Sequence, residues 1–372
     1  MKIGIITNFL DESSGGIATY THNLIKNINR IDNNNEYVLI HHTKNDIAVY
    51  KNNDEIIIPI IKTPFKWLLW RFFRLPISFI NNRYYSLDMV HDTFEIGPLT
   101  FNLPIKKIIT IYDLSAYLYP QYHTLINFLL HRLLLKRAIS NANRILTISQ
   151  YSKDAIVKYF DINPNKVVVT SLGVDEKYKV CKDRKILNST RLKYKLPIKF
   201  ILYVGTLEPR KNVPGLLRAY LRLAKKNQIP LVIVGKKGWR YAEIFKTIEA
   251  SNSKNMFIFL GHVPDEDLPI IYNLASVFVY PSFYEGFGLP ILEAMSCGCP
   301  VITSNTSSLP EVSGGASILI NPYKIQTLTK AISDVLSKDE LRKSMIEKGL
   351  KQASKFSWEK CAKQTLEVYN GR

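Results

Sequence analysis

Short apolar runs alternate with amphipathic segments along most of this 372-residue chain. Most runs are followed by a glycine-containing or polar loop, and then by apolar residues at helical spacing. Alternation of this kind predicts parallel sheets with helices on both faces. The expected strands cover residues 2–7, 37–42, 55–61, 87–91, 107–111, 144–149, 167–171, 200–204, 231–235, 256–260, 277–282 and 301–304.

The pattern is interrupted once, by a charged and polar stretch between two series of strands. Residues 175–196 lack apolar periodicity, and a new buried strand is expected from residue 200. A chain of this length exceeds the size at which one hydrophobic core stops growing. We therefore predict two domains. The expected parts are an N-terminal domain at 1–178, a linker at 179–197, a C-terminal domain at 198–356 and a last helix at 357–372.

The stretch 280–300 carries the densest candidate chemistry. A buried strand ends near Ser282, a glycine-broken turn follows, and a helix is expected from Pro290, where the missing proline N–H would be unbonded anyway. Glu285 lies in the turn and Glu293 in the first turns of the helix. A helix N-terminus favours an anionic ligand. The two carboxylates suit hydroxyl donors beside that anion, such as those of a ribose and a sugar.

Two further loops follow predicted strands and suit phosphate. Arg210 and Lys211 come just before a helix expected from about residue 213. Arginine can bind phosphate oxygens with two parallel hydrogen bonds and lysine adds a point charge, so this pair suits a diphosphate. Gly15 and Gly16 lie between a strand and a helix, where they allow close backbone approach to a ligand. Their spacing differs from the G-x-G-x-x-G dinucleotide fingerprint.

These residues carry a family resemblance. The run E-G-F-G-L-P-x-L-E-A-M-x-C-G-x-P-V from Glu285 resembles the E-x7-E signature of glycosyltransferase family 4, which are retaining enzymes. The loop G-x-L-x-x-R-K-N from Gly205 resembles the diphosphate-binding loop of the same family. The resemblance implies an α/β GT-B fold, in which two Rossmann-like parallel-sheet domains face a cleft. It also implies that the N-terminal domain binds the acceptor and that the last helix crosses back to that domain.

The resemblance also implies roles for individual residues. Glu285 is expected to contact the donor sugar, and Glu293 the ribose hydroxyls. Arg210 and Lys211 are expected to stabilise the charge that develops on the departing diphosphate. The remaining expected donor-binding residues are Gly15, Gly16, Gly205, Val263, Gly286, Phe287, Gly288 and Leu289.

One segment departs from the family pattern. Residues 110–114 read T-I-Y-D-L, where the family usually has T-x-H-D-L, so Tyr112 occupies the usual histidine place. We expect Tyr112 to donate a hydrogen bond to a sugar hydroxyl and Asp113 to accept one from the acceptor. His91, at the end of another predicted strand, is an alternative ligand-facing histidine or simply a hydrogen-bonded structural residue.

The implied reaction is transfer of a hexose from a nucleotide diphosphate sugar to a hydroxyl group. The amino-acid sequences at 112–114 and 283–290 are similar to those of bacterial mannosyltransferases of surface polysaccharide synthesis. GDP-mannose is therefore the favoured donor and a lipid-linked oligosaccharide the favoured acceptor. No Asp-x-Asp site stands where a metal would bridge a diphosphate, so we expect neither metal nor cofactor.

The formal charge of +19 predicts attraction to an acidic partner. Residues 66–85 interleave basic and aromatic side chains. Two interpretations of this segment stay open: peripheral contact with an anionic membrane, or an amphipathic helix packed on its own domain. The chain has no apolar run of about eighteen residues and starts with a strand rather than a signal peptide. Its four cysteines form no disulfide framework, so we expect the cytoplasm, with peripheral attachment to the inner face of the membrane.

Other functions were weighed. A nucleotide-sugar epimerase on the same fold would share the donor site without needing an acceptor groove. A nucleic-acid-binding protein would need basic and stacking aromatic residues along one face, and only residues 66–85 fit that description. We therefore expect no nucleic-acid partner. A sugar-binding protein without catalysis is a third alternative.

Overall fold

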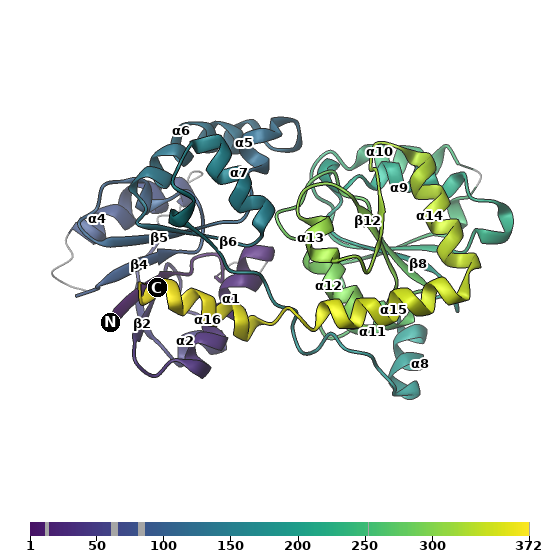
Figure 1. Ribbon diagram of the computed structural model, residues 1–372, viewed down its shortest axis with the longest axis horizontal. Helices are drawn as coiled ribbons and strands as arrows, with labels where there is room; N and C mark the ends of the chain where they lie inside the picture. Colours follow the sequence, from purple (N-terminus) through teal and green to yellow (C-terminus); the bar gives the residue numbers. More distant parts are fainter. Residues whose placement is uncertain (12–14, 61–65, 81–85, 252, 372) are drawn as a thin grey trace. The chain divides into compact units, whose positions relative to one another are not determined.

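The computed structural model describes residues 1–11, 15–60, 66–80, 86–251 and 253–371. The chain divides into two compact units, which are described separately here (Figure 1). Unit 1 comprises Met1–Gly173 and Trp358–Arg372, and unit 2 comprises Val174–Ser357. The boundary falls earlier than the predicted residue 178, and the predicted linker 179–197 belongs to unit 2.

The supposed linker contains a helix because local capping replaces apolar periodicity there. Asp183 accepts hydrogen bonds from the backbone N–H groups of Lys185 (2.8 Å) and Ile186 (3.4 Å), which caps α8 (Arg184–Lys193). The helix packs against α11 (Leu268–Leu274). Its sequence is polar because most of its surface faces solvent, which is why the hydrophobic pattern predicted no helix.

Unit 1 is built on seven parallel strands in the order β3-β2-β1-β4-β5-β6-β7. Gly4 of β1 lies opposite Val38 of β2 and Val90 of β4, so β1 is central. Near-continuous apolar strands suit a sheet buried on both faces. The strands are β1 (Lys2–Ile6), β2 (Glu36–His41), β3 (Asp54–Ile57), β4 (Met89–Asp92), β5 (Lys106–Ile111), β6 (Arg144–Thr147) and β7 (Val167–Val169).

Helices cover both faces of this sheet. One face buries a core cluster that includes Trp70, Leu135 and Ile156, together with Ile40 and Ile109 from the strands. The opposite face is covered by α1 and α16, which pack against each other. The helices are α1 (Gly16–Ile31), α2 (Ala48–Lys51), α3 (Lys66–Leu69), α4 (Leu75–Ile80), α5 (Ser115–Leu118), α6 (Leu125–Asn141), α7 (Gln150–Phe160) and α16 (Trp358–Tyr369).

His91 anchors the returning helix α16. Its ring Nδ1 lies 2.7 Å from the Tyr369 hydroxyl, and its Nε2 lies 2.8 Å from Thr110 Oγ1. His91 is fully buried, and burial lowers its pKa to about 3, so the ring is neutral. Both ring nitrogens are used inside unit 1. The structural interpretation of His91 is therefore correct, and the ligand-facing one is wrong.

Unit 2 repeats the architecture with six parallel strands in the order β10-β9-β8-β11-β12-β13. The strands are β8 (Ile201–Val204), β9 (Leu231–Val234), β10 (Phe257–Gly261), β11 (Val277–Tyr280), β12 (Val301–Ser304) and β13 (Ile318–Ile320). Besides α8 and α11, the helices are α9 (Val213–Leu221), α10 (Ala242–Glu249), α12 (Leu289–Ser296), α13 (Leu309–Ser313), α14 (Ile325–Ser337) and α15 (Asp339–Ala353).

Each sheet has one point at which the chain order of its strands reverses. In unit 1 this point lies between β1 and β4, and in unit 2 between β8 and β11. Loops leaving the carboxyl ends of two such strands separate to opposite faces of the sheet and leave a crevice that commonly holds the ligand. The loops after β8 and β11 contain the cations and carboxylates identified from the sequence.

Residues 66–80 pack against unit 1. Trp70 is fully buried and donates its indole N–H to the Ile58 carbonyl (2.6 Å). Arg71 is buried against Asp92 (2.8 Å). Phe73 and Ile77 remain exposed. Packing on its own domain is therefore correct for one face of the segment, membrane contact stays a prediction for the other, and residues 81–85 lie outside the described part.

Within the described ranges, no helix combines the length and the apolar character needed to cross a bilayer.

The His91–Tyr369 contact gives a test of how α16 is held. Tyr369→Phe removes the hydroxyl and leaves a buried ring nitrogen without its partner, so we expect a loss of about 1–3 kcal/mol in unfolding free energy. Tyr323→Phe, at an exposed site, is the control and should change little. Denaturant unfolding of the full chain measures both, and equal stabilities for the two variants would contradict this role.

Candidate active site

The candidate site is built on the loops that follow β8 and β11. These strands are neighbours at the reversal point of unit 2, so their carboxyl ends open at the same edge. The β8 loop also contacts the β9 loop closely. A Cβ on Gly235 would lie 2.0 Å from the Gly205 carbonyl oxygen, so no larger residue fits there. Glycines thus let the strand-end loops approach one another.

Arg210, Lys211 and Glu285 form one ion-paired cluster. An Arg210 guanidinium nitrogen lies 2.9 Å from Glu285 Oε2, and Lys211 Nζ lies 2.7 Å from Glu285 Oε1. The other Arg210 terminal nitrogen pairs with Glu208 at 2.9 Å, and Lys211 also donates to the Tyr280 hydroxyl at 2.7 Å. The structure therefore brings Glu285 together with Lys211 and Arg210, which lie 74 and 75 positions before it in the chain.

The charges in this cluster balance, with two cations facing two carboxylates. Burial acts to raise the pKa of Glu285, but Arg210 and Lys211 outweigh it and lower that pKa to about 2. Burial, with Arg210 as the neighbouring cation, lowers the pKa of Lys211, while Glu285 acts in the opposite direction. Buried charges need partners of this kind, because an unpaired one would remain desolvated at high cost.

Hydroxyl groups of two neighbouring serines hold the backbone of the loop that carries Glu285. Ser307 Oγ accepts the backbone N–H of Glu285 at 2.9 Å. Ser308 Oγ donates to the carbonyl oxygens of Glu285 (2.8 Å) and Phe287 (2.9 Å). Glu285, Gly286, Phe287 and Gly288 are all buried. The carboxylate is thus presented on a rigid backbone rather than on a free loop.

The loop passes directly into α12 at Leu289, one residue before the predicted start, which places Pro290 at the second helical position. Gly288 caps the helix with φ of +112°, a region that disfavours any residue with a Cβ. The first N–H groups of a helix have no partner within it. This end of the helix therefore offers donors next to the Glu285 loop.

Glu293 lies in α12 but has partners different from those of Glu285. The Tyr272 hydroxyl donates to its Oε2 at 3.0 Å. Burial is the largest influence and raises the pKa of Glu293 to about 7, although Tyr272 and Lys177 act to lower it. The neighbouring loop contains Val263, which is buried just after β10. Glu293 therefore forms a second polar position separate from the ion cluster.

The unit 1 candidates lie beyond the ends of β1 and β5. Gly15 and Gly16 are exposed, and Gly15 starts α1 with φ of +94°. Asp113 Oδ1 accepts the backbone N–H of Ser115 at 2.6 Å. The Tyr112 hydroxyl donates to the Thr93 carbonyl at 2.8 Å. The predicted donation from Tyr112 to a sugar would require breaking this bond, because a phenol has only one proton.

Sequence reasoning missed several members of the site. Glu208 and Tyr280, which complete the ion cluster, both lie within the two stretches that we had singled out. Glu208 could have been found because it lies two residues before Arg210, and Tyr280 because it is the last residue of β11. Ser308 begins a run, Ser308–Glu311, that continues the family pattern, but nothing in the sequence indicated that Ser307 and Ser308 bind the Glu285 loop, because only the fold brings them together.

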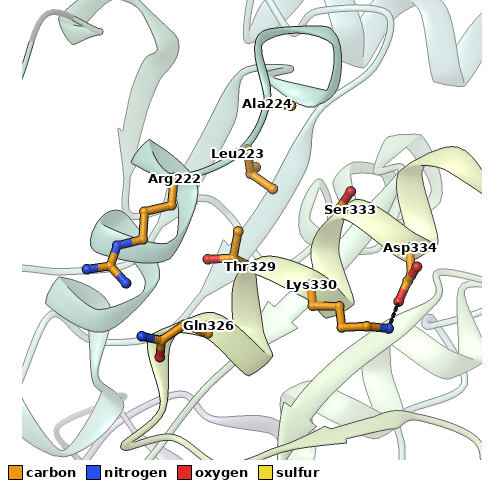
Figure 2. A pocket seen from close by; sticks show the side chains of 8 residues that line it. All are labelled: Arg222, Leu223, Ala224, Gln326, Thr329, Lys330, Ser333 and Asp334. Carbon is orange, nitrogen blue, oxygen red and sulfur yellow. Dashed lines mark hydrogen bonds and ion pairs between the residues drawn. The ribbon is translucent and has the colours of Figure 1, made fainter.

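Two other findings bear on ligands. A shallow pocket of about 410 Å³ lies at the end of α9 and along α14, and the Lys330–Asp334 ion pair (2.8 Å) is at its rim (Figure 2). None of the predicted donor-binding residues lines it. Among the described residues, no group of three His, Cys, Asp or Glu side chains could hold a metal ion. Metal-independent transfer nevertheless stays a prediction.

Comparison with known proteins assigns both halves of the chain. Residues 188–352 match the family described as "Glycosyl transferases group 1". Residues 14–178 match the family described as "Glycosyltransferase Family 4". The first match spans all the strands of unit 2 from β8 to β13, the second spans β2 to β7 of unit 1 but not β1, and both stop short of α16.

The chain is similar to two curated proteins of Escherichia coli. It is 38% identical to O-antigen chain mannosyltransferase B over 291 residues, which covers 77% of this chain and 76% of that protein. It is 32% identical over 287 residues to the serotype-specific mannosyltransferase WbdA, covering 75% of this chain but only 35% of WbdA. The chain therefore spans about a third of the length of this second relative.

A solved structure with the same fold is Anabaena HepE in complex with UDP and glucose. The two superpose with a TM-score of 0.79 at 18% sequence identity, and the match covers 100% of both chains. Such low identity shows a shared fold and nothing about the ligand of this chain.

The elevated pKa of Glu293 makes stability depend on pH. In the unfolded chain the carboxyl ionises near its ordinary pKa of 4.5, whereas the folded protein keeps the proton until about pH 7. Between these two pH values, ionisation of the carboxyl stabilises the unfolded state but not the folded state. The free energy of unfolding therefore falls as pH rises. Glutamine does not titrate, and Glu293→Gln should therefore melt at a higher temperature than wild type above pH 7.

The control for this effect is Glu340→Gln, at an exposed carboxylate. Thermal melts at about pH 4.5 and about pH 8.5 bracket the window. The advantage of Glu293→Gln should appear only at the higher pH, and that of the control at neither. A difference from wild type that is the same at both pH values would show that Glu293 does not hold a proton as described.

Proposed function

Because this chain belongs to the group 1 and family 4 glycosyltransferases, we propose that it transfers a hexose, favoured as mannose from GDP-mannose, to a hydroxyl of a growing surface polysaccharide. The donor would bind to unit 2 and the acceptor to unit 1. The observation that carries this proposal is the cluster of Arg210, Lys211 and Glu285 at the reversal point of the unit 2 sheet.

The cluster has the chemistry that a departing nucleoside diphosphate requires. Arg210 and Lys211 carry N–H groups that bind Glu208, Glu285, the Tyr280 hydroxyl and the Tyr284 carbonyl in this structure. Phosphate oxygens would accept these and share the cations with Glu208 and Glu285. Once the phosphate binds part of Arg210 and Lys211, the Glu285 carboxylate would accept a hydrogen bond from a hydroxyl of the donor sugar. The Glu285 carboxylate is ionised at any working pH, since its pKa lies at about 2.

The transfer step moves one sugar and one proton. The bond between C1 of the hexose and the diphosphate oxygen breaks, and its electron pair stays on that oxygen. The acceptor hydroxyl oxygen forms a new bond to C1 from the same face, which retains the configuration. The acceptor proton passes to the leaving phosphate oxygen. Preorganised cations that stabilise this developing charge lower the barrier by several kcal/mol, about 3–4 for one donor.

The remaining donor contacts follow the family pattern. Glu293 would accept hydrogen bonds from the ribose hydroxyls, and the backbone groups of Val263 would bind the nucleobase. Gly15 and Gly16 of unit 1 are also proposed donor-binding residues, and the α12 N-terminus would add N–H donors near Gly288. With this many positive groups, transfer would proceed without a divalent metal. Asp113 would accept a hydrogen bond from the acceptor.

The proposed donor and acceptor rest on the relatives. The name of the 38% identical E. coli protein states mannose transfer in O-antigen chain synthesis. WbdA, at 32% identity, is also named a mannosyltransferase. A lipid-linked oligosaccharide, which the resemblance to enzymes of surface polysaccharide synthesis implies, is the proposed acceptor. The proposed site of action is the inner face of the cell membrane.

Substitution of Lys211 tests the diphosphate role. Lys211→Ala should lower kcat by about 10²–10³, because one preorganised donor to the leaving group is lost. The fold should persist, because Glu285 keeps Arg210 as a partner. Mannose transfer to an acceptor glycan is the assay, and Lys343→Ala, at an exposed lysine, is the control. Wild-type turnover in a folded Lys211→Ala protein would contradict the proposed role.

Thermal shift against a panel of nucleotide sugars tests the donor. A ligand present at about 100 times its Kd stabilises the folded state by about 2.7 kcal/mol. GDP-mannose should therefore raise the melting temperature more than GDP-glucose or any UDP sugar, and should do so equally in EDTA. A shift with UDP sugars alone would replace mannose as the proposed donor, and no shift with any compound would contradict the donor site itself.

A further inference from the structure

Helix α6 exposes a row of large apolar side chains. Leu125 is 69% exposed, Ile126 62%, Leu129 44% and Leu133 72%. At about 100° per residue, these four lie within one arc of about 100° on the helix. The row is therefore a continuous stripe and not a scatter of single residues, which would need no explanation.

The opposite face of α6 is already buried in the core of unit 1. His131, Leu135, Ala138 and Ile139 pack there, with His131 Nε2 bound to Glu95 at 3.0 Å. A helix on the surface of a globular protein normally has one apolar stripe and one polar face. This helix has two apolar faces, and the outer one has no partner among the described residues.

Cations border the exposed stripe. Arg132, Lys136 and Arg137 are exposed on α6, and the helix contains no aspartate or glutamate. The Arg132 guanidinium lies over the Tyr117 ring at 5.0 Å, which holds it beside the stripe. Apolar side chains flanked by cations suit the boundary between lipid tails and anionic headgroups.

A neighbouring segment adds to this surface. Phe73 (60% exposed) and Ile77 (57% exposed) point outward from residues 66–80, and Arg74 is exposed between them. This segment and α6 bury their inner sides in the same core cluster, and both contact the 3₁₀ turn Pro98–Thr100. They therefore cover the same face of the sheet (Figure 1). Residues 66–80 also lack acidic side chains.

The apolar stripe starts next to the predicted acceptor edge of unit 1. Asp113, just beyond β5, accepts the N–H of Ser115. Ser115 Oγ lies 3.0 Å from His123 Nε2, and His123 Nδ1 lies 3.2 Å from the Asn127 amide in the first turn of α6. A run of hydrogen bonds thus connects Asp113 to the helix end where Leu125 and Ile126 are exposed.

We propose that the outer face of α6, extended by Phe73 and Ile77, docks unit 1 on an anionic bilayer and brings Asp113 to the level of the headgroups. A lipid-linked acceptor would then present its glycan to the carboxyl edge of the sheet without leaving the membrane. The account of the acceptor rests on the proposed function. The docking itself does not, because it is measured without substrates.

Vesicle cosedimentation of the full chain tests this surface. Wild type should bind vesicles of phosphatidylcholine with 30% phosphatidylglycerol, bind pure phosphatidylcholine vesicles less, and dissociate as salt is raised. The double variant Leu129→Ser/Leu133→Ser should bind at least about 10-fold more weakly, since two large apolar side chains no longer enter the interface. It should keep its melting temperature and its transfer to a water-soluble acceptor.

The matched control is Leu192→Ser/Ile198→Ser in unit 2, where the two side chains are 78% and 82% exposed. It should bind vesicles like wild type, and so should Lys211→Ala. Failure of wild type to bind, or equal binding by the two double variants, would overturn the proposal. So would sedimentation velocity showing a dimer that only Leu129→Ser/Leu133→Ser abolishes, because the face would then hold a second copy.

Discussion

A buried carboxylate held between two cations is the constraint around which unit 2 is organised. Glu285 is nearly inaccessible to solvent and would be strongly destabilising without Arg210 and Lys211, at 2.9 and 2.7 Å. The cations come from the loop after β8 and the carboxylate from the loop after β11. Their pairing therefore fixes the two loops that leave the reversal point of the sheet, where α/β proteins bind ligands.

The same pairing accounts for how the protein can hold two neighbouring buried cations in the absence of a ligand. With Glu208 and Glu285 present, the two cations are neutralised, and the site does not repel itself. A diphosphate bound at this cluster would supply new acceptors for the same N–H groups. Exchange of one set of anions for another costs less than creating unpaired buried charges. The proposed transfer would need no nucleophile from the protein, only charges and dipoles that are already in place.

Much of this could be predicted because the information was local. Apolar runs predicted the strands except the three-residue β13. The stretches at 205–212 and 280–300 carried the site residues together with the turns that present them. What failed depended on tertiary context. His91 ends an apolar run, as a ligand-facing residue would, but Tyr369 returns from 278 positions away to bind it. Likewise, α8 forms from capping rather than from periodicity. The Tyr112 hydroxyl donates to the Thr93 carbonyl here, and its hydrogen bond to a sugar stays a prediction.

The exposed face of α6 shows a different limit of sequence reading. Its sequence shows a wide apolar face with a basic edge, a pattern that does not say how much of that face is buried. Only the structure shows that half of the apolar surface stays outside the core. The charge of the whole chain, +19, indicated an acidic partner without locating it. The structure shows that some of these cations lie beside exposed leucines on α6 of unit 1, next to the predicted acceptor edge.

The most direct test of the central claim is the preference for a diphosphate over a monophosphate. Calorimetry would measure Kd for the nucleoside diphosphate and monophosphate of the same base, in wild type and in Lys211→Met. If the ion cluster holds the diphosphate, the wild-type preference should shrink by about 10- to 100-fold in the variant, the value of one charged hydrogen bond. An unchanged preference would contradict the account, because the second phosphate would then lie elsewhere.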